Sequence, residues 1–262
     1  PPRSTLFPYT TLFRSAFGLM SLPLVAVEKN QPNIIFFLAD DMGIGDAGCY
    51  GQKIIKTPNI DALASSGVQF MQHYSGSTVS APSRCALMTG KHTGQAAIRG
   101  NGSSVVRNED ADLSLPLEEI TVAEILKEKG YATACVGKWG LGGPQSNGSP
   151  VNQGFDYFFG YLSQGAAHRY YPEFLYENES KYPLNGQYSH TVIMQKGLEF
   201  IEKNVTKPFF AYFAVTPPHA DLDIPDLGIY NNKFPETPHI NNSTKGYKTQ
   251  LQPKAAYAAM VS

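Results

Sequence analysis

Three continuous apolar runs constrain the fold of this chain most strongly. They cover residues 33–39 (NIIFFLA), 131–137 (YATACVG) and 208–215 (PFFAYFAV). Runs of this length, rich in β-branched and aromatic residues, are typical of strands that are covered on both faces of a sheet. We therefore expect each run to be a buried strand.

Helical patterns separate these runs. Thr57-Pro58 opens one pattern that Gly67 closes, and Thr121 and Glu124 form a capping box at the start of another, which ends at Gly130. Strands that alternate with helices predict an α/β fold, with a mostly parallel sheet flanked by helices. The helices are expected over residues 58–66, 82–89, 121–129 and 190–203, with the opening of another over 255–262, and a further strand is expected over 68–74.

Composition excludes several classes of protein. The 262 residues suffice for one large α/β domain or two small ones. Lys plus Arg number 21 against 22 Asp plus Glu, without a basic run, so a nucleic-acid partner is not expected. The three cysteines, Cys49, Cys85 and Cys135, are too few and too scattered for a disulfide framework or a zinc knuckle, and we expect small buried thiols.

The first 27 residues are expected to lie outside the folded domain. Residues 5–15 (TLFPYTTLFRS) resemble the translation of a common sequencing adaptor, so residues 1–15 are interpreted as an artefact. Residues 16–27 (AFGLMSLPLVAV) are apolar but too short to span a bilayer, and they are interpreted as the remnant of an export signal. We therefore expect a periplasmic or secreted bacterial protein, with no membrane span in the mature chain.

Chemically active side chains gather where the predicted strands end. Ligands of open α/β sheets bind at the carboxyl ends of the strands. Any one of these residues alone fits a solvated turn, a helix cap or a surface position equally well. Together, two carboxylates, a hydroxyl, two cations and an imidazole suit a divalent metal and an oxyanion substrate: Asp40, Asp41, Ser80, Arg84, Lys138 and His219.

The string from Ser80 to Gly90, SAPSRCALMTG, resembles the defining motif of the sulfatase family: Cys or Ser, any residue, Pro, Ser or a similar residue, Arg, then Thr-Gly. The resemblance extends over residues 32–262, in the family's order, through NIIFFLADDMG, TPNIDALASSGVQF, GYATACVGKWGLG and PFFAYFAVTPPH. It implies the alkaline-phosphatase-like sulfatase core, with residues 28–262 as the N-terminal part of the catalytic domain.

The resemblance also implies an activity, the hydrolysis of aryl or carbohydrate sulfate monoesters. In this family the first residue of the motif, here Ser80, is oxidised to Cα-formylglycine. The hydrated aldehyde offers one hydroxyl to attack sulfur and a second whose proton loss releases sulfate, a route that plain serine lacks. A serine in this place implies maturation by the bacterial radical-type enzyme.

Each of the other residues takes a role by the same resemblance. Asp40 and Asp41, with the modified Ser80, would bind Ca²⁺ or Mg²⁺. Arg84 would hold the formylglycine hydrate, Lys138 a sulfate oxygen, and His219 the bridging-oxygen side of the substrate.

Gly140 is the first departure from the family pattern, because many relatives have histidine after Lys-Trp. His168 is a candidate substitute or a substrate contact, and His92 is a further candidate contact. Ordinary loop positions explain both histidines equally well.

A missing Asp-Asn-Gly, with which the family completes its metal site, is the second departure. We therefore expect the 262-residue product to bind its cation poorly and to have little or no sulfatase activity.

Two alternative functions stay open. One is a phosphomonoester or phosphonate hydrolase of the same superfamily, and the other is a non-catalytic binding relative. The aromatic segment 155–176 is consistent with stacking on a sugar ring, but such residues also serve as ordinary packing.

Overall fold

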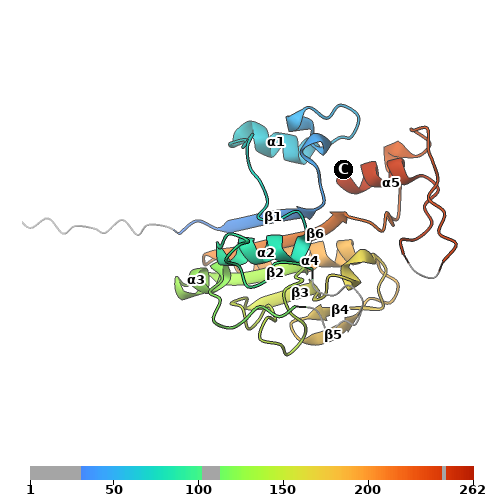
Figure 1. The fold of residues 1–262 in the computed structure, drawn as a ribbon. Helices are drawn as coiled ribbons and strands as arrows, with labels where there is room; N and C mark the ends of the chain where they lie inside the picture. The colour runs from blue at the N-terminus through green and yellow to red at the C-terminus, as the bar shows by residue number, and fades with distance from the viewer. Residues whose placement is uncertain (1–30, 102–112, 244–245) are drawn as a thin grey trace, which may run out of the picture. The chain divides into compact units, whose positions relative to one another are not determined.

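A six-stranded mixed sheet forms the centre of the computed structural model (Figure 1), with strand order β1-β6-β2-β3-β4-β5. The structure describes residues 31–101, 113–243 and 246–262, so the predictions for residues 1–15 and 16–27 lie outside the described residues. Residues 32–262 form one compact unit. The strands are β1 (Ile34–Asp40), β2 (Ala132–Lys138), β3 (Tyr157–Tyr161), β4 (Phe174–Glu177), β5 (Ser180–Pro183) and β6 (Phe209–Pro218).

Parallel pairing joins the first four strands of this order, β1, β6, β2 and β3, while β4 and β5 are antiparallel additions. The carboxyl ends of β1, β2 and β6 therefore meet at the same edge, as expected for α/β sheets. The helices are α1 (Pro58–Ser66), α2 (Ser80–Thr89), α3 (Val122–Glu128), α4 (Ser189–Lys203) and α5 (Pro253–Val261), with short 3-10 turns at Ile44–Asp46, Gly48–Tyr50, Ala166–His168 and Gly228–Tyr230.

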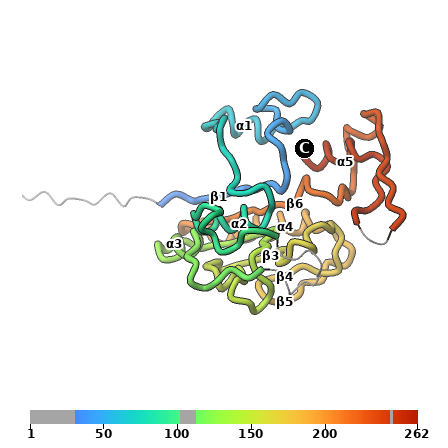
Figure 2. Tube along the Cα trace, in the orientation of Figure 1, coloured from blue at the N-terminus to red at the C-terminus, as the bar shows by residue number. Residues whose placement is uncertain are grey.

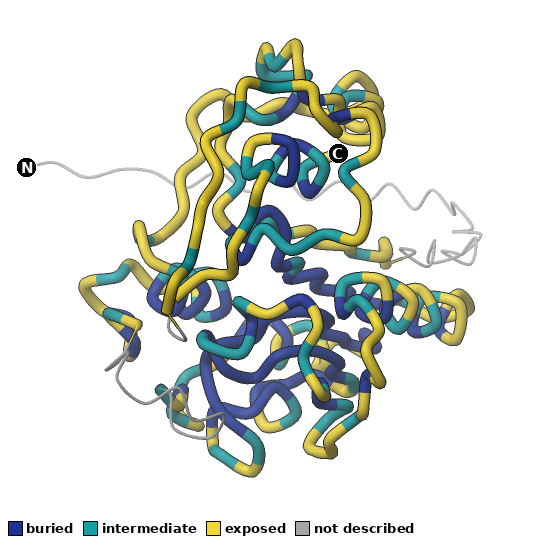
Figure 3. The backbone as a smooth tube through the Cα atoms, turned by 90° about the vertical axis from the view of Figure 1, so that its right-hand side faces the viewer, coloured by how far each residue is buried: buried dark blue, intermediate teal, exposed yellow. Residues whose placement is uncertain are grey.

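Helices cover both faces of the central strands. Along β6, Phe209, Ala211 and Phe213 belong to the core under α4, and the alternate residues Phe210 and Tyr212 belong to the core under α2 and α3. This alternation follows from the two-residue period of a strand. Buried residues concentrate along the central strands, as Figure 3 shows.

Several predicted elements are confirmed. The mostly parallel α/β sheet is present, and α1, α2, α3, α4, α5 and β2 lie within one or two residues of the expected bounds, while β6 extends three residues beyond its expected end, to Pro218. Thr121 and Glu124 form the predicted capping box, since the Thr121 hydroxyl accepts from the Glu124 amide at 3.2 Å. Cys85 and Cys135 are buried free thiols as expected, whereas Cys49 is half-buried.

Two expectations are wrong. No strand forms over residues 68–74, which run exposed within the long excursion from β1 through α1 to α2 (Figure 2). The strand at 33–39 is not covered on both faces, because Ile35, Phe36 and Phe37 are exposed. Among the described strands, β1 pairs with β6 alone and lies at an edge of the sheet.

This edge gives the chain an exposed apolar strand. Phe37 is 57% exposed although it stacks on Phe213, and Ile35 is 50% exposed. An unpaired apolar edge strand is a template for pairing with another chain. We expect the 262-residue polypeptide to self-associate in solution, and Phe37→Lys to shift it towards the monomer in light-scattering measurements. Leu198→Lys, which changes an exposed residue of α4, is the matched control, and an equal effect of both variants would contradict a role for the edge.

A second prediction concerns His190 near the start of α4. Burial lowers the pKa of this imidazole, and within the described part of the chain its Nδ1 atom is buried without a hydrogen-bond partner. The unfolded chain therefore binds more protons than the folded chain below pH about 6.5, the ordinary histidine pKa. The free energy of unfolding should fall as the pH decreases through this range, by up to about 1.4 kcal/mol per pH unit.

Denaturant titrations at a series of pH values test this expectation. His190→Gln should flatten the dependence between about pH 7 and pH 5.5, where the unperturbed imidazole titrates. His239→Gln, which changes an exposed histidine, should leave it intact. An unchanged slope in His190→Gln would show that other groups cause the dependence.

Among the described helices, none is long and apolar enough to cross a membrane.

Candidate active site

A buried ionic cluster lies where β1 and β2 end. The Asp40 carboxylate accepts a hydrogen bond from Lys138 Nζ at 2.7 Å through Oδ2, and its Oδ1 lies 3.3 Å from Arg84 Nη2. The three side chains are 7%, 1% and 3% exposed, respectively. Two cations and one carboxylate leave the cluster with a net positive charge, which suits an anionic ligand.

Arg84 connects this cluster to Ser80. Both residues lie on α2, four positions apart, so their side chains share one face of the helix. Arg84 Nε donates to Ser80 Oγ at 2.9 Å, and Arg84 Nη1 donates to the Lys138 carbonyl oxygen. The predicted site residues Ser80, Arg84, Lys138 and Asp40 therefore lie together.

The charges around Asp40 favour its ionised form. Burial raises the pKa of the Asp40 carboxyl group, but Lys138 and Arg84 outweigh burial, and the pKa lies below its usual value. The carboxylate therefore stays charged across the neutral range and holds both cations in place.

The first turn of α2 is fixed by a residue that the sequence analysis missed. Ala81 N donates to Asn101 Oδ1 at 2.9 Å. Ser80 is itself the first residue of the helix, with Val79 preceding it, which places its side chain at the positive end of the helix dipole.

A pair of imidazoles lies on the other side of the Asp40-Asp41 turn. His219 Nε2 is 3.3 Å from Asp41 Oδ2, and the His168 ring centroid is 4.6 Å from that of His219. Tyr170 donates its hydroxyl hydrogen bond to the His219 carbonyl oxygen at 2.7 Å. His219 and His168, predicted separately, are therefore neighbours, and Asp41 joins them to the ionic cluster through the chain.

The structure explains why position 140 is a glycine. Its φ of +74° favours glycine, and a Cβ atom there would lie 2.0 Å from Gln164 Nε2. Gln164 donates from this nitrogen to the Gly140 carbonyl oxygen at 3.1 Å. The Gln164 amide therefore fills the space in which a side chain at position 140 would begin.

His92 has a local role in the structure. It is exposed, and its Nδ1 accepts from the Gly94 amide at 3.1 Å. Its predicted contact with substrate stays a prediction.

Asp40 and Asp41 offer carboxylate oxygens, the ligands that Ca²⁺ and Mg²⁺ prefer. Their chemistry fits a hard cation, but Ca²⁺ takes about six to eight oxygens. Within residues 31–101, 113–243 and 246–262, no group of three or more His, Cys, Asp or Glu side chains is arranged to hold a metal. The two aspartates therefore fit as part of a coordination shell and do not complete one.

Comparison with known proteins defines the family of this chain. The family model described as Sulfatase matches residues 32–262. Human steryl-sulfatase is 45% identical over 139 residues, which cover 50% of this chain and 24% of that protein. Dog N-acetylgalactosamine-6-sulfatase is 34% identical over 240 residues, which cover 80% of this chain and 43% of that protein.

Solved structures agree with this assignment. The crystal structure of Ps i-CgsB in complex with k-i-k-neocarrahexaose has a TM-score of 0.71 and 29% identity, covering 88% of this chain and 52% of that one. The chain therefore belongs to the Sulfatase family. It spans between about a quarter and a half of the length of these relatives.

Proposed function

We propose that the intact protein carrying these residues hydrolyses sulfate monoesters, using a formylglycine made from Ser80. The observation that carries the proposal is the cluster in which Ser80 lies at the start of α2, bonded to Arg84, beside the buried Asp40 and Lys138. A net positive, preorganised site suits the negative charge that develops on sulfate oxygens.

The side chains of this chain then have defined tasks. Arg84 Nε holds the oxygen on residue 80, as it holds Ser80 Oγ at 2.9 Å here. Lys138 supplies a point charge to a sulfate oxygen, and Asp40 positions both cations. His219, whose Nε2 lies 3.3 Å from the exposed Asp41 carboxylate, would donate a proton to the leaving oxygen. Formylglycine, when present, supplies as its hydrate two hydroxyl groups on one carbon.

The proposal includes a hard divalent cation. Asp40 and Asp41 would be two of the ligands of Ca²⁺ or Mg²⁺, and the ion would polarise the sulfate oxygens when bound.

The relatives' names support a carbohydrate sulfate as substrate. One relative is named N-acetylgalactosamine-6-sulfatase, and one structural neighbour was solved with an oligosaccharide bound. The names of other relatives, such as steryl-sulfatase, point to apolar sulfate esters. We favour the carbohydrate ester, because the polar side chains of Asp41 and His168 lie beside the His219 ring.

Serine in place of cysteine at position 80 supports a radical-type maturase as the partner that makes the formylglycine. A periplasmic or secreted bacterial location accords with the apolar segment at residues 16–27.

Paired substrates test the activity. The intact protein, produced together with a radical-type maturase, is assayed on matched sulfate and phosphate monoesters of the same alcohol. We expect kcat/KM to be higher for the sulfate, and activity to require the maturase. Preference for the phosphate would support the phosphomonoesterase alternative instead, and no turnover of either ester would support the non-catalytic binding relative.

A further inference from the structure

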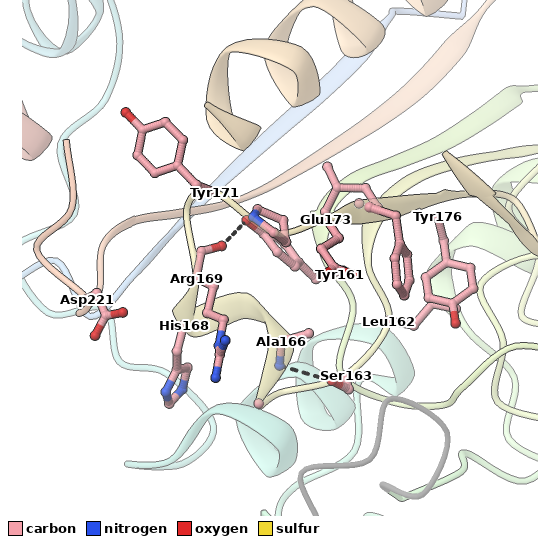
Figure 4. Close-up of a pocket in the computed structure, with 15 residues that line it drawn as sticks. Tyr161, Leu162, Ser163, Ala166, His168, Arg169, Tyr171, Glu173, Tyr176 and Asp221 are labelled. Atoms are coloured by element: carbon pink, nitrogen blue, oxygen red, sulfur yellow. Dashed lines mark hydrogen bonds between the residues drawn. The ribbon is translucent and has the colours of Figure 1, made fainter. Parts of the chain in front are cut away.

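A cavity of about 510 Å³ opens beside the imidazole pair (Figure 4). It lies between the carboxyl end of β3, the loop that follows, and β4. His168 lines this cavity and also contacts the His219 ring, so the cavity borders the proposed site of sulfate cleavage. The polar residues that line it are Ser163, His168, Arg169, Glu173 and Asp221, with Tyr171 and Tyr176 among the aromatic ones.

Arg169 is the feature of this cavity that lacks a structural explanation. Its backbone is fixed, because its amide donates to the Ala166 carbonyl oxygen at 3.1 Å and its own carbonyl oxygen accepts from Tyr161 Oη at 2.6 Å. Its guanidinium group has no hydrogen bond or ion pair with the described residues. In Figure 4 the side chains of His168 and Arg169 extend in the same direction. A hydrogen-bonded backbone therefore presents a cationic group that none of the described side chains pairs with.

The other charged groups of the cavity include two carboxylates, Glu173 and Asp221, which accept hydrogen bonds. Glu173 is exposed, and Asp221 accepts from the Lys248 amide through Oδ1 at 3.0 Å, which leaves Oδ2 for another donor. Tyr171 offers a partly exposed ring, with Lys248 Nζ 5.9 Å from its centroid. Acceptors, a donor fork and an aromatic ring together suit a hydroxyl-rich ring with an anionic substituent better than an apolar steroid.

The position of His168 ties this cavity to the reacting end of the substrate. The Asp221 amide donates to the His168 carbonyl oxygen at 3.1 Å, which fixes the cavity wall to the segment that follows His219. An ester whose bridging oxygen faces His219 would therefore extend its alcohol part past His168 towards Arg169.

We propose that this cavity binds the sugar ring of the leaving group, and that Arg169 pairs with a second anionic group on it, a carboxylate or a second sulfate. The inference rests on the proposed function and names a specificity-determining residue for it. A guanidinium matches either anion through two parallel hydrogen bonds, whereas a neutral sugar sulfate lacks this partner.

Steady-state kinetics of the matured, intact protein test the proposal. Three substrates are compared: a neutral monosaccharide with one sulfate ester, the same sugar with a second sulfate, and a singly sulfated sugar with a carboxylate. Arg169→Ala should lower kcat/KM for at least one of the two substrates with an additional anion by about tenfold to a hundredfold, mainly through KM. The neutral substrate should change by less than about twofold, as for an exposed side chain away from a site.

Two variants serve as controls. Arg169→Lys keeps the positive charge but not the two parallel donors of the guanidinium, so it should recover part of the kcat/KM that Arg169→Ala loses. Arg99→Ala removes an exposed arginine outside the cavity and should leave the selectivity unchanged. The substrate whose kcat/KM falls more in Arg169→Ala identifies the additional anion as carboxylate or sulfate.

Equal behaviour of wild type and Arg169→Ala on all three substrates would overturn the inference while leaving sulfatase activity intact. Failure of wild type to hydrolyse any of them would instead contradict the proposed function, so the two failures are distinguishable.

Discussion

Ser80→Ala should abolish sulfate-ester hydrolysis by the matured, intact protein. Alanine offers no oxygen to attack sulfur and cannot be oxidised to an aldehyde. Loss of a nucleophile lowers kcat by about 10⁴-fold to 10⁶-fold in other hydrolases. Progress curves with a chromogenic sulfate ester measure the loss.

Stability should change little in this variant, because the Ser80 hydroxyl makes one hydrogen bond to the described part of the chain, with Arg84 Nε at 2.9 Å. Ser65→Ala on α1 is the control for a serine whose hydroxyl bonds only within its own helix. Retention of most activity in Ser80→Ala would place the nucleophile elsewhere.

Asp40→Asn should destabilise the fold far more than Asp41→Asn does. The Asp40 side chain is 7% exposed and lies between Lys138 and Arg84, so its neutralisation leaves two buried cations without a counter-charge. Removal of one partner of a buried ion pair costs about 3–5 kcal/mol. The Asp41 side chain is 72% exposed, and its replacement should change the free energy of unfolding by less than about 0.5 kcal/mol.

Denaturant unfolding in the presence of a chelator isolates this effect from any bound cation. The two aspartates are neighbours in the chain and undergo the same substitution, which makes the comparison a matched pair. Similar, small changes in both variants would show that the buried cluster contributes little to stability.

Much of the fold was predictable because its signals are local. The apolar runs of β2 and β6 contain few polar residues because helices cover them on both faces, and the capping box at Thr121 marks α3 by chemistry that needs no tertiary context. The motif at Ser80 and the rule that sites lie at the carboxyl ends of strands brought Asp40, Ser80, Arg84 and Lys138 together correctly.

Other features depend on contacts between distant segments, which the sequence pattern does not contain. The apolar composition of β1 fits a central strand as well as the edge strand that it forms here, because composition does not specify strand order. The strands β3, β4 and β5 were not predicted, because the sequence pattern of the segment that contains them does not distinguish short strands from a loop.

The neighbours of the site were missed for the same reason. Gln164 occupies the space beside Gly140 only because the chain turns back there after β3, and Asn101 reaches the Ala81 amide from a loop 20 residues away. Glycine at position 140, where the family pattern has histidine, was the one local signal available. Arg169 gave no signal, since an arginine in a loop is ordinary.

The most direct test of the central proposal is mass spectrometry of the peptide that contains residue 80, from active protein isolated with its maturase. We predict that residue 80 has two hydrogen atoms fewer than serine and reacts with a carbonyl reagent, and that the modified fraction follows sulfatase activity across preparations. An unmodified Ser80 in fully active protein would contradict the account.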